Sequence, residues 1–305
     1  NIIMINFIKR TNLFLIISSV TIVVSLLLVL VFGLKPGIDF TGGTVVQISG
    51  VTTQDGSEVS KDEVSHILSD QGVDVVSVIT TSTGFELRFK ETSQEQWTPV
   101  SDVFAQTYAG YVQDSFQTVG PVLGQELVRK TLFAVILSSI SLLFYIAWRF
   151  KDRVFGIAAV IALIHDVLVI LGTFALLGNL LNVEVDVMFV TATLTALAFS
   201  VHDTIVLFDR VREVKRRQPK DDFETVMNTA INSTLVRSLS TSLSIAFVLI
   251  ALLVLGGTVI RWFVVALLVG TISGAYSSPF TAAPLTVFWH RWKKNKSATT
   301  RSRNT

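Results

Sequence analysis

The sequence of 305 residues contains no cysteine and comparatively few charged residues. Without cysteine the chain can hold no disulfide and no thiolate-bound metal. Charged types make up 16% of the residues and apolar types make up 50%. A soluble globular chain carries about 25% charged residues, so we expect part of this chain to lie in lipid.

Motifs of catalysis and nucleotide binding are missing as well. The sequence contains no HExxH, no GxSxG, no GxxxxGKS/T and no cluster of metal ligands. Each of these motifs supplies groups that its chemistry requires: histidines for zinc, a nucleophilic serine, or a glycine-rich loop for phosphates. We therefore expect a protein that is not an enzyme and that binds no cofactor, metal or nucleic acid.

Six stretches are each apolar over about the 20 residues that a helix needs to cross the hydrocarbon core. They are Leu13–Phe32, Thr131–Trp148, Val154–Leu177, Val187–Phe208, Leu239–Leu255 and Trp262–Trp289. Pro279 and Pro284 interrupt the last stretch, which predicts a kink or an exit from the membrane near its end. The fifth stretch opens with hydroxyl side chains that are too polar to face lipid and that indicate a helix–helix contact. These are Ser238, Ser240, Thr241, Ser242 and Ser244.

Basic residues gather in every second connection between these stretches. The basic segments are Lys9-Arg10, the Arg149/Lys151/Arg153 turn, the Arg210–Lys220 loop and the tail Arg291–Arg303. The loops Gly178–Asp186 and Gly256–Arg261 are poor in basic residues. The positive-inside rule assigns the basic segments, and with them both termini, to the cytoplasmic side of the inner membrane. The N-terminal apolar run lacks a small-residue cleavage site after it, so we expect it to stay as an anchor.

This topology predicts a polytopic α-helical membrane protein that divides into four parts. Residues 1–34 form the N-terminal end and the first span, and residues 35–129 form an extracytoplasmic α+β domain. Residues 130–290 form the second to sixth spans, and residues 291–305 form a basic cytoplasmic tail.

The extracytoplasmic part has the pattern of a ferredoxin-like domain. Ser60 with Glu63 three residues later has the capping-box spacing of a helix start. The Ser82-Thr83-Gly84 turn predicts a hairpin between the second and third strands. The resulting order β-α-β-β-α-β is that of the ferredoxin-like motif. The expected strands are Val45–Ile48, Val73–Thr80, Phe85–Phe89 and Tyr111–Val119. The expected second helix is Ser93–Tyr108.

Ionisable residues inside apolar stretches are costly and are functional candidates by default. Asp203 lies roughly 9 Å inside the cytoplasmic end of the fourth stretch, and Arg237 is expected at a similar depth in the fifth. A pair of these two would keep Asp203 ionised, whereas a dry surrounding favours the neutral acid. A carboxyl group balanced between the two states is what a proton pathway requires. His165 and Asp166 in the third stretch and His202 in the fourth are auxiliary candidates.

Structural alternatives stay open for each of these residues. The Asp203–Arg237 pair could simply tie two helices together, and His165 with Asp166 could serve the packing of the bundle. His202 is adjacent to Asp203 and therefore points to another side of the helix. Asp209 and Arg210 lie where the fourth stretch ends, which also fits a solvated helix end.

Several blocks of the sequence match one family in order and spacing. Gly37, Asp39, Gly42 and Gly43 belong to the first, GIDFTGGT, where the paired glycines allow a tight turn into the first strand. The other blocks are Val119–Leu127, His165-Asp166, Asp203–Glu213 (with Asp209 and Arg210), Arg237, Gly256-Gly257 and Gly274–Pro284. Together they resemble the SecF members of the SecD/SecF family, which belongs to the resistance-nodulation-division superfamily.

The resemblance implies an accessory subunit of the bacterial Sec protein-export machinery. Such a subunit pairs with SecD beside the SecYEG channel and uses the proton gradient to promote preprotein translocation across the inner membrane. Further partners that it implies are YajC, YidC, the unfolded preprotein and membrane lipid. The proton-pathway aspartate and arginine of the family fall on Asp203 and Arg237. His202 departs from the family pattern, in which asparagine precedes that aspartate, so an altered pH response is expected.

Two other functions compete with this interpretation. A proton-driven exporter of small molecules or lipids from the same superfamily would carry larger outer domains and two membrane halves in one chain. A membrane-anchored sensor or scaffold would tolerate a neutral polar pair in place of Asp203 and Arg237.

Overall fold

The computed structural model describes residues 6–52, 59–73, 75–81, 83–90, 92–108, 110–150, 152–257 and 259–302. Ser82 of the expected hairpin turn and Lys151 of the expected basic turn lie outside these ranges, as do residues 1–5 and 303–305. The chain forms two compact units, one of residues 1–35 with 134–305 and one of residues 36–133.

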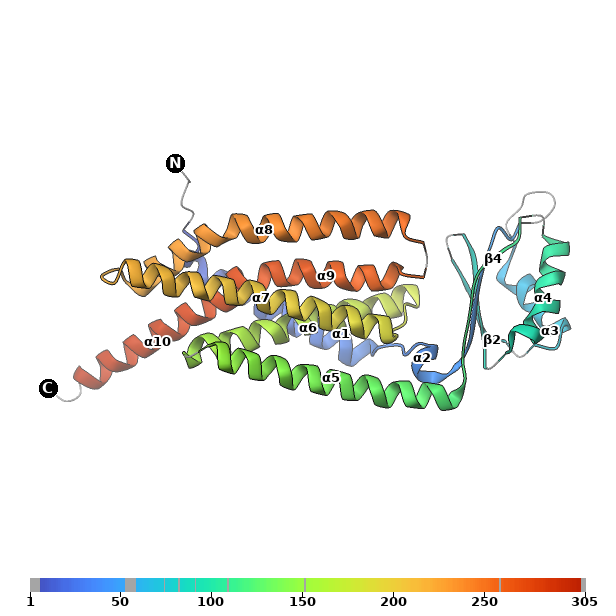
Figure 1. Ribbon diagram of the computed structural model, residues 1–305, viewed down its shortest axis with the longest axis horizontal. Coiled ribbons are helices and arrows are strands. Elements are labelled where there is room, and N and C mark those ends of the chain that lie inside the picture. The colour runs from blue at the N-terminus through green and yellow to red at the C-terminus, as the bar shows by residue number, and fades with distance from the viewer. Residues whose placement is uncertain are drawn as a thin grey trace. The chain divides into compact units, whose positions relative to one another are not determined.

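Within the described ranges, six helices are long and apolar enough to cross a membrane, which confirms the predicted number of spans. The sixth consists of α9, the π-helical turn η2 and α10, and a short 3-10 helix η1 (Ile8–Arg10) precedes the first (Figure 1). The bounds are α1 Thr11–Phe32, α5 Pro121–Arg149, α6 Arg153–Leu181, α7 Val187–Arg217, α8 Phe223–Leu255, α9 Arg261–Ser277, η2 Ser278–Ala282 and α10 Ala283–Ser302.

Two helices extend well beyond the apolar stretches that predicted them. Helix α5 begins at Pro121, ten residues before the expected Thr131. Helix α8 begins at Phe223, the start that the expected depth of Arg237 assumes, although its apolar stretch begins only at Leu239. Hydropathy detects the lipid-facing part of a helix, whereas the helix itself continues through polar residues such as Glu126 and Asn232. Proline also suits the first turn of a helix because its missing N–H would have no partner there.

The prolines of the sixth span produce a local change of helix type. Pro279 lies within the five-residue π-helical turn Ser278–Ala282, after which α10 continues the chain. Proline has no N–H to donate to the preceding turn, and a π-bulge is one way in which a helix absorbs that loss. The predicted disturbance is therefore present, but the chain stays helical on both sides of it.

Helices α6, α7 and α9 form the interior of the helical unit. In the most apolar part of each helix, about half of the residues of α6, α7 and the sixth span are buried, whereas few of those of α5 and α8 are. The N-terminal part of α8, with Val226, Met227, Ala230 and Ile231, is also buried. Gly270 and Gly274 of α9 let this helix approach α7 closely: a Cβ atom added at Gly270 would lie 2.3 Å from Cβ of Ala196. One added at Gly274 would lie 3.0 Å from Cβ of Ser200. This spacing of small residues is typical of helix contacts in membranes.

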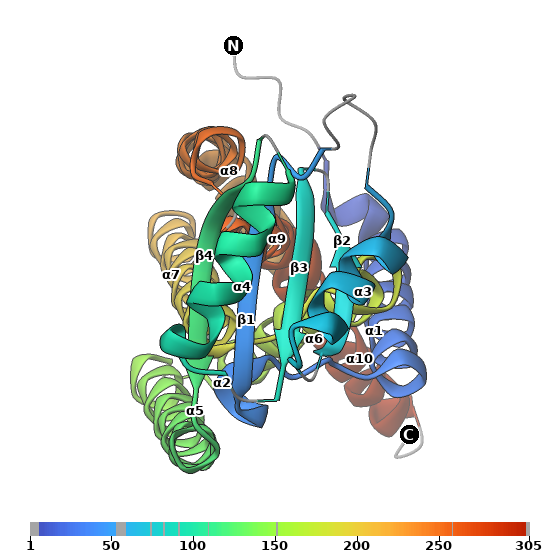
Figure 2. The same cartoon turned by 90° about the vertical axis from the view of Figure 1, so that its right-hand side faces the viewer.

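The second unit has the predicted ferredoxin-like topology. Its sheet has the order β2-β3-β1-β4 with every neighbouring pair antiparallel, and Figure 2 shows α3 and α4 on one face of it. The four-residue helix α2 (Ile38–Thr41) precedes the sheet. The remaining bounds are β1 Gly43–Ser49, α3 Lys61–Asp70, β2 Val75–Thr80, β3 Gly84–Phe89, α4 Gln94–Thr107 and β4 Val112–Val119.

The glycine pair of the first motif makes the turn that the sequence predicts. Gly42 ends α2 with φ 73° and Gly43 opens β1 with φ 121°. Both values lie in a region that residues with a Cβ atom rarely adopt. A Cβ atom at Gly43 would also lie 2.8 Å from the carbonyl oxygen of Phe89 on β3. These two glycines therefore have a structural role in starting the sheet.

Local capping explains where the two helices of this domain begin. Ser60 accepts a hydrogen bond from the backbone N–H of Glu63, as predicted. The carboxylate of Glu63 accepts a hydrogen bond from the Tyr108 hydroxyl at 3.2 Å. At the start of α4, Ser93 and Gln96 form a full capping box. Burial of Tyr108, together with the nearby Glu63, raises the pKa of Tyr108 to about 12.

Candidate functional site

Asp203 lies on α7 with its side chain half-buried, and its partner is not the one that the sequence predicts. The hydroxyl of Ser238 on α8 donates to Oδ2 of Asp203. Arg237, the residue before Ser238, is exposed, and no ion pair joins it to Asp203 in the part of the chain that the structure describes. Helix α8 thus presents to Asp203 the residue that follows Arg237.

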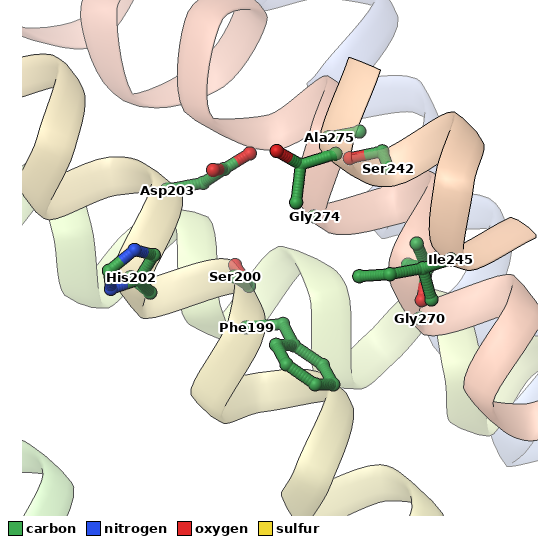
Figure 3. A pocket seen from close by; sticks show the side chains of 11 residues that line it. Phe199, Ser200, His202, Asp203, Ser242, Ile245, Gly270, Gly274 and Ala275 are labelled. Carbon is green, nitrogen blue, oxygen red and sulfur yellow. The ribbon is translucent and has the colours of Figure 1, made fainter. Parts of the chain in front are cut away.

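Asp203 borders a cavity of about 50 Å³ between α7, α8 and α9 (Figure 3). A water molecule needs about 10–15 Å³ of such space, so the cavity can hold more than one. Hydroxyl groups from all three helices provide the polar partners that water requires. The lining residues are Phe199, Ser200, His202, Asp203, Thr241, Ser242, Ile245, Gly270, Thr271, Gly274 and Ala275.

His202 also borders this cavity, but its ring is exposed. In Figure 3 the side chains of His202 and Asp203 leave α7 in different directions, as expected for consecutive residues of a helix. The hydroxyl side chains at residues 238–244 of α8 also point to different sides of their helix. Ser238 contacts Asp203, Thr241 and Ser242 line the cavity, and Ser240 and Ser244 are exposed.

Asp166 on α6 forms the most buried polar cluster of the helical unit, with 1% of its surface exposed. Its Oδ2 accepts hydrogen bonds from Ser200 at 2.5 Å and from Ser277 at 2.7 Å. Its Oδ1 accepts one from Ser273 at 2.6 Å and lies 3.0 Å from Nδ1 of His165. Four donors from three helices thus surround one carboxyl group, which offsets much of the cost of burying it.

The three serines that donate to Asp166, Ser200, Ser273 and Ser277, are not among the residues that the sequence predicts. Ser200 belongs to α7, and Ser273 and Ser277 are four residues apart on α9 and therefore share a face of that helix. They lie near the place where α9 approaches α7 closely, because Gly274 of α9 packs against Ser200 of α7. Hydroxyl side chains at this spacing next to a GxxxG pattern are the signal that could have found them.

His165 completes the cluster from the other side. Its ring stacks on that of Tyr276 with centroids 6.0 Å apart, and the Tyr276 hydroxyl lies 3.4 Å from the Ser18 hydroxyl of α1. Nδ1 faces the carboxylate, so with Asp166 ionised this nitrogen carries the hydrogen. Nε2 is buried and has no hydrogen-bond partner among the described residues.

The side chains of Asp209 and Arg210 contact neighbouring helices and do not extend freely into solvent. Asp209 forms an ion pair with Arg149 at the end of α5 and lies 3.6 Å from Arg212. Arg210 forms an ion pair with Glu213 at 2.6 Å and donates to the Ser233 hydroxyl of α8 at 2.9 Å. The other motif residues, Gly37, Asp39, Gly42 and Gly43, belong to the second unit.

Among the described residues there is no group of three or more histidine, aspartate or glutamate side chains placed to hold a metal ion. What the helices do bring together is two carboxyl groups, Asp203 and Asp166, each held by hydroxyl donors inside an apolar bundle. Six apolar helices of membrane-spanning length, together with an α+β domain, define a polytopic membrane protein with ionisable groups in its interior.

Comparison with known proteins places this architecture in a family. Residues 100–292 match the family described as "Protein export membrane protein SecD/SecF, C-terminal", and residues 27–52 match the "SecD/SecF GG Motif". The chain belongs to the SecD/SecF family of protein export membrane proteins, which confirms the resemblance seen in the sequence.

Relatives align with nearly the whole chain. It is 39% identical to the protein translocase subunit SecF of Thermobaculum terrenum, over 94% of both chains. It is 34% identical to the SecDF of Bacillus subtilis over 94% of this chain and 38% of that protein. The crystal structure of SecDF from Thermus thermophilus, a translocon-associated membrane protein, superposes with a TM-score of 0.80 at 30% identity. The superposition covers 94% of this chain and 39% of the SecDF chain.

Proposed function

We propose that this chain is the SecF-type half of a membrane complex that promotes preprotein export at the expense of the proton gradient, with Asp203 as the proton carrier. The observation that carries the proposal is an ionisable residue inside an apolar helix, half-buried and bordering a cavity of about 50 Å³ to which several hydroxyl side chains contribute. Such residues are costly in a membrane and typically mark a pathway for ions or protons. The names of the relatives, protein translocase subunits, favour protein export over small-molecule or lipid export.

A SecD-type chain is the proposed partner. The matched segment makes up 38% and 39% of the two SecDF chains, so in those proteins a further part accompanies the segment that resembles this chain. The description of SecDF from Thermus thermophilus as translocon-associated supports a proposed association of this chain with SecYEG. YajC, YidC and the unfolded preprotein are proposed partners on the resemblance of the sequence motifs.

Protonation of Asp203 is proposed to change its partner on α8. Arg237 and Ser238 are consecutive, so they leave the helix about 100° apart. A neutral Asp203 is satisfied by the hydroxyl of Ser238, whereas an ionised one is stabilised more strongly by a guanidinium group. A rotation of α8 that exchanges the two partners would give two discrete arrangements, and the proton gradient would drive the complex between them.

The proposed orientation places both termini in the cytoplasm and the α+β domain of residues 35–129 outside. The basic connections at Lys9-Arg10, Arg149 and Arg210–Lys220 support it. In this orientation the gradient supplies protons from the side of the α+β domain.

Export into inverted vesicles tests the proposal, with ATP held constant and the gradient switched on and off. Asp203→Asn keeps the shape of the side chain but cannot ionise, so the increment of export that depends on the gradient should disappear. Copurification with the SecD-type chain should survive, because asparagine can still accept the hydrogen bond of Ser238.

Asp209→Asn is the matched control, since it removes a carboxylate from the same helix outside the cavity. It should keep most of the increment. A full increment in Asp203→Asn would leave the residue with a structural role alone.

A further inference from the structure

Ser200 belongs to the surroundings of both carboxyl groups in the helical unit. It lines the cavity that Asp203 borders, and its hydroxyl donates to Oδ2 of Asp166 at 2.5 Å. Asp203 follows Ser200 by three residues on α7, so the two side chains lie on neighbouring parts of one helix face. Figure 3 shows both residues on the wall of the cavity.

We propose that Asp166 is a second proton-binding site, reached from Asp203 through water in the cavity and the hydroxyl of Ser200. This inference rests on the proposed function of Asp203 and extends its pathway into the centre of the bundle. His165 is the positioning residue, because its Nδ1 holds Oδ1 of Asp166.

The transfer needs no group beyond these side chains and water. Neutral Asp203 releases its carboxyl proton to water in the cavity, and that water passes one of its own protons to Oγ of Ser200. Ser200 gives its original hydroxyl proton to Oδ2 of Asp166, to which it already donates. The O–H bond of Asp203 has broken, an O–H bond on Asp166 has formed, and both water and Ser200 are unchanged.

The cluster can accommodate the neutral form of Asp166. With a proton on Oδ2, one of the two hydroxyls that donate to this atom must find another acceptor. The hydroxyl of Ser277 has one at hand, since it lies 3.4 Å from the carbonyl oxygen of Gly274. If the hydroxyl of Ser277 turns to Gly274, its oxygen can accept from the new O–H of Asp166, so both protonation states of Asp166 can be hydrogen-bonded in the same bundle.

Few other titratable side chains contact this cluster. His165 lies on the same helix as Asp166, and α9 contributes Tyr276, which stacks on His165. From α7 the titratable neighbour is Asp203, on the far side of Ser200, and α1 contributes the neutral hydroxyl of Ser18 beside Tyr276. A proton that reaches Asp166 therefore has His165 as its nearest alternative acceptor.

Two of the serines distinguish a proton pathway from a structural cluster. Ser200 and Ser273 each donate one short hydrogen bond to Asp166, at 2.5 and 2.6 Å, and both are buried. Ser200 lines the cavity and Ser273 is not among its lining residues. If the cluster only holds helices together, replacing either serine by alanine should have the same effect.

The test compares Ser200→Ala with Ser273→Ala in the full complex with the SecD-type chain. Gradient-dependent export into inverted vesicles should fall about tenfold or more in Ser200→Ala, because the hydroxyl that relays the proton is lost. It should fall about twofold or less in Ser273→Ala, which removes a hydrogen bond to Asp166 but no step of the transfer. Recovery of the complex should be equal in both variants. Equal losses of export in the two variants would overturn the proposal.

A direct readout follows the proton itself. Infrared difference spectra of the purified complex between acidic and neutral pH should contain a C=O band of a buried carboxylic acid that Asp166→Asn removes. After a jump from neutral to acidic pH, the band should appear more slowly in Ser200→Ala than in Ser273→Ala, because the relay hydroxyl sets the rate of proton transfer. A spectrum unchanged by Asp166→Asn would also overturn the proposal.

Export by Asp203→Asn separates this inference from the proposed function on which it rests. A full gradient-dependent increment of export in Asp203→Asn contradicts the proposed function. If Asp203→Asn loses the increment but Ser200→Ala keeps it, this inference alone is contradicted.

Discussion

The hydroxyl of Ser238 on α8 donates a hydrogen bond to the carboxyl group of Asp203 on α7. Ser238 directly follows Arg237, whose side chain is exposed. This contact joins a helix of the buried interior to one whose most apolar part has few buried residues. A rotation of α8 by about 100° would therefore replace the hydroxyl of Ser238 by the charge of Arg237 next to Asp203.

Ser238→Ala should weaken the arrangement seen here without removing the carboxyl group. Loss of a hydrogen bond to an ionisable group costs about 1.5–3 kcal/mol, which favours the alternative in which Arg237 approaches Asp203. Gradient-dependent export should fall, yet by less than in Asp203→Asn. Ser240→Ala on the exposed side of α8 is the control and should behave as the unchanged protein. Equal export rates in Ser238→Ala and Ser240→Ala would contradict a role for this contact.

Gly270→Ala should destabilise the helical unit. The new Cβ atom would lie 2.3 Å from Cβ of Ala196, so α7 and α9 must separate, and overpacking of this kind costs about 1–3 kcal/mol. Gly156→Ala on α6 is the matched control, because its Cβ atom would have its nearest neighbour at 3.9 Å. That variant should be as stable as the unchanged protein or more so by about 0.5–1 kcal/mol. Thermal unfolding in detergent measures both, and equal midpoints would contradict the close contact.

Tyr108 should make the stability of the α+β domain depend on alkaline pH. Its folded-state pKa of about 12 lies above the ordinary tyrosine pKa of 10.0, so folding favours the protonated hydroxyl that donates to Glu63. The stabilisation is present below pH 10 and is lost as the pH rises from 10 to about 12. Tyr108→Phe should remove this part of the pH dependence. The full-length protein can be followed by circular dichroism, with Tyr145→Phe in α5 as a control for general effects of alkali.

The proposed orientation predicts which positions accept a reporter that is active only in the cytoplasm. Reporters fused after Arg303 or within the segment from Arg216 to Lys220 should be active, since these segments are rich in basic residues. Reporters inserted near Gly84 or Gly178 should be inactive. Activity at Gly84 or Gly178 would reverse the assignment of the two sides.

The sequence by itself determined the classes of element and their order. Hydropathy located all six spans, because about 20 apolar residues have few stable alternatives to crossing a membrane. Alternating strands, the Ser60 cap and the glycine pair at Gly42 and Gly43 were enough for the ferredoxin-like domain. The cost of ionisable groups in lipid also identified Asp203 and Asp166 as residues that need an explanation.

The tertiary structure alone decided which side chains meet in the interior. Polar side chains lie on several sides of α8 near Arg237, so the pattern does not say which face is turned to α7. A rotation of about 100° separates Arg237 from Ser238. The serines around Asp166 come from two helices whose approach depends on Gly270 and Gly274. Such contacts depend on helix rotation and interhelical distance, which packing of the whole bundle sets and local periodicity does not encode.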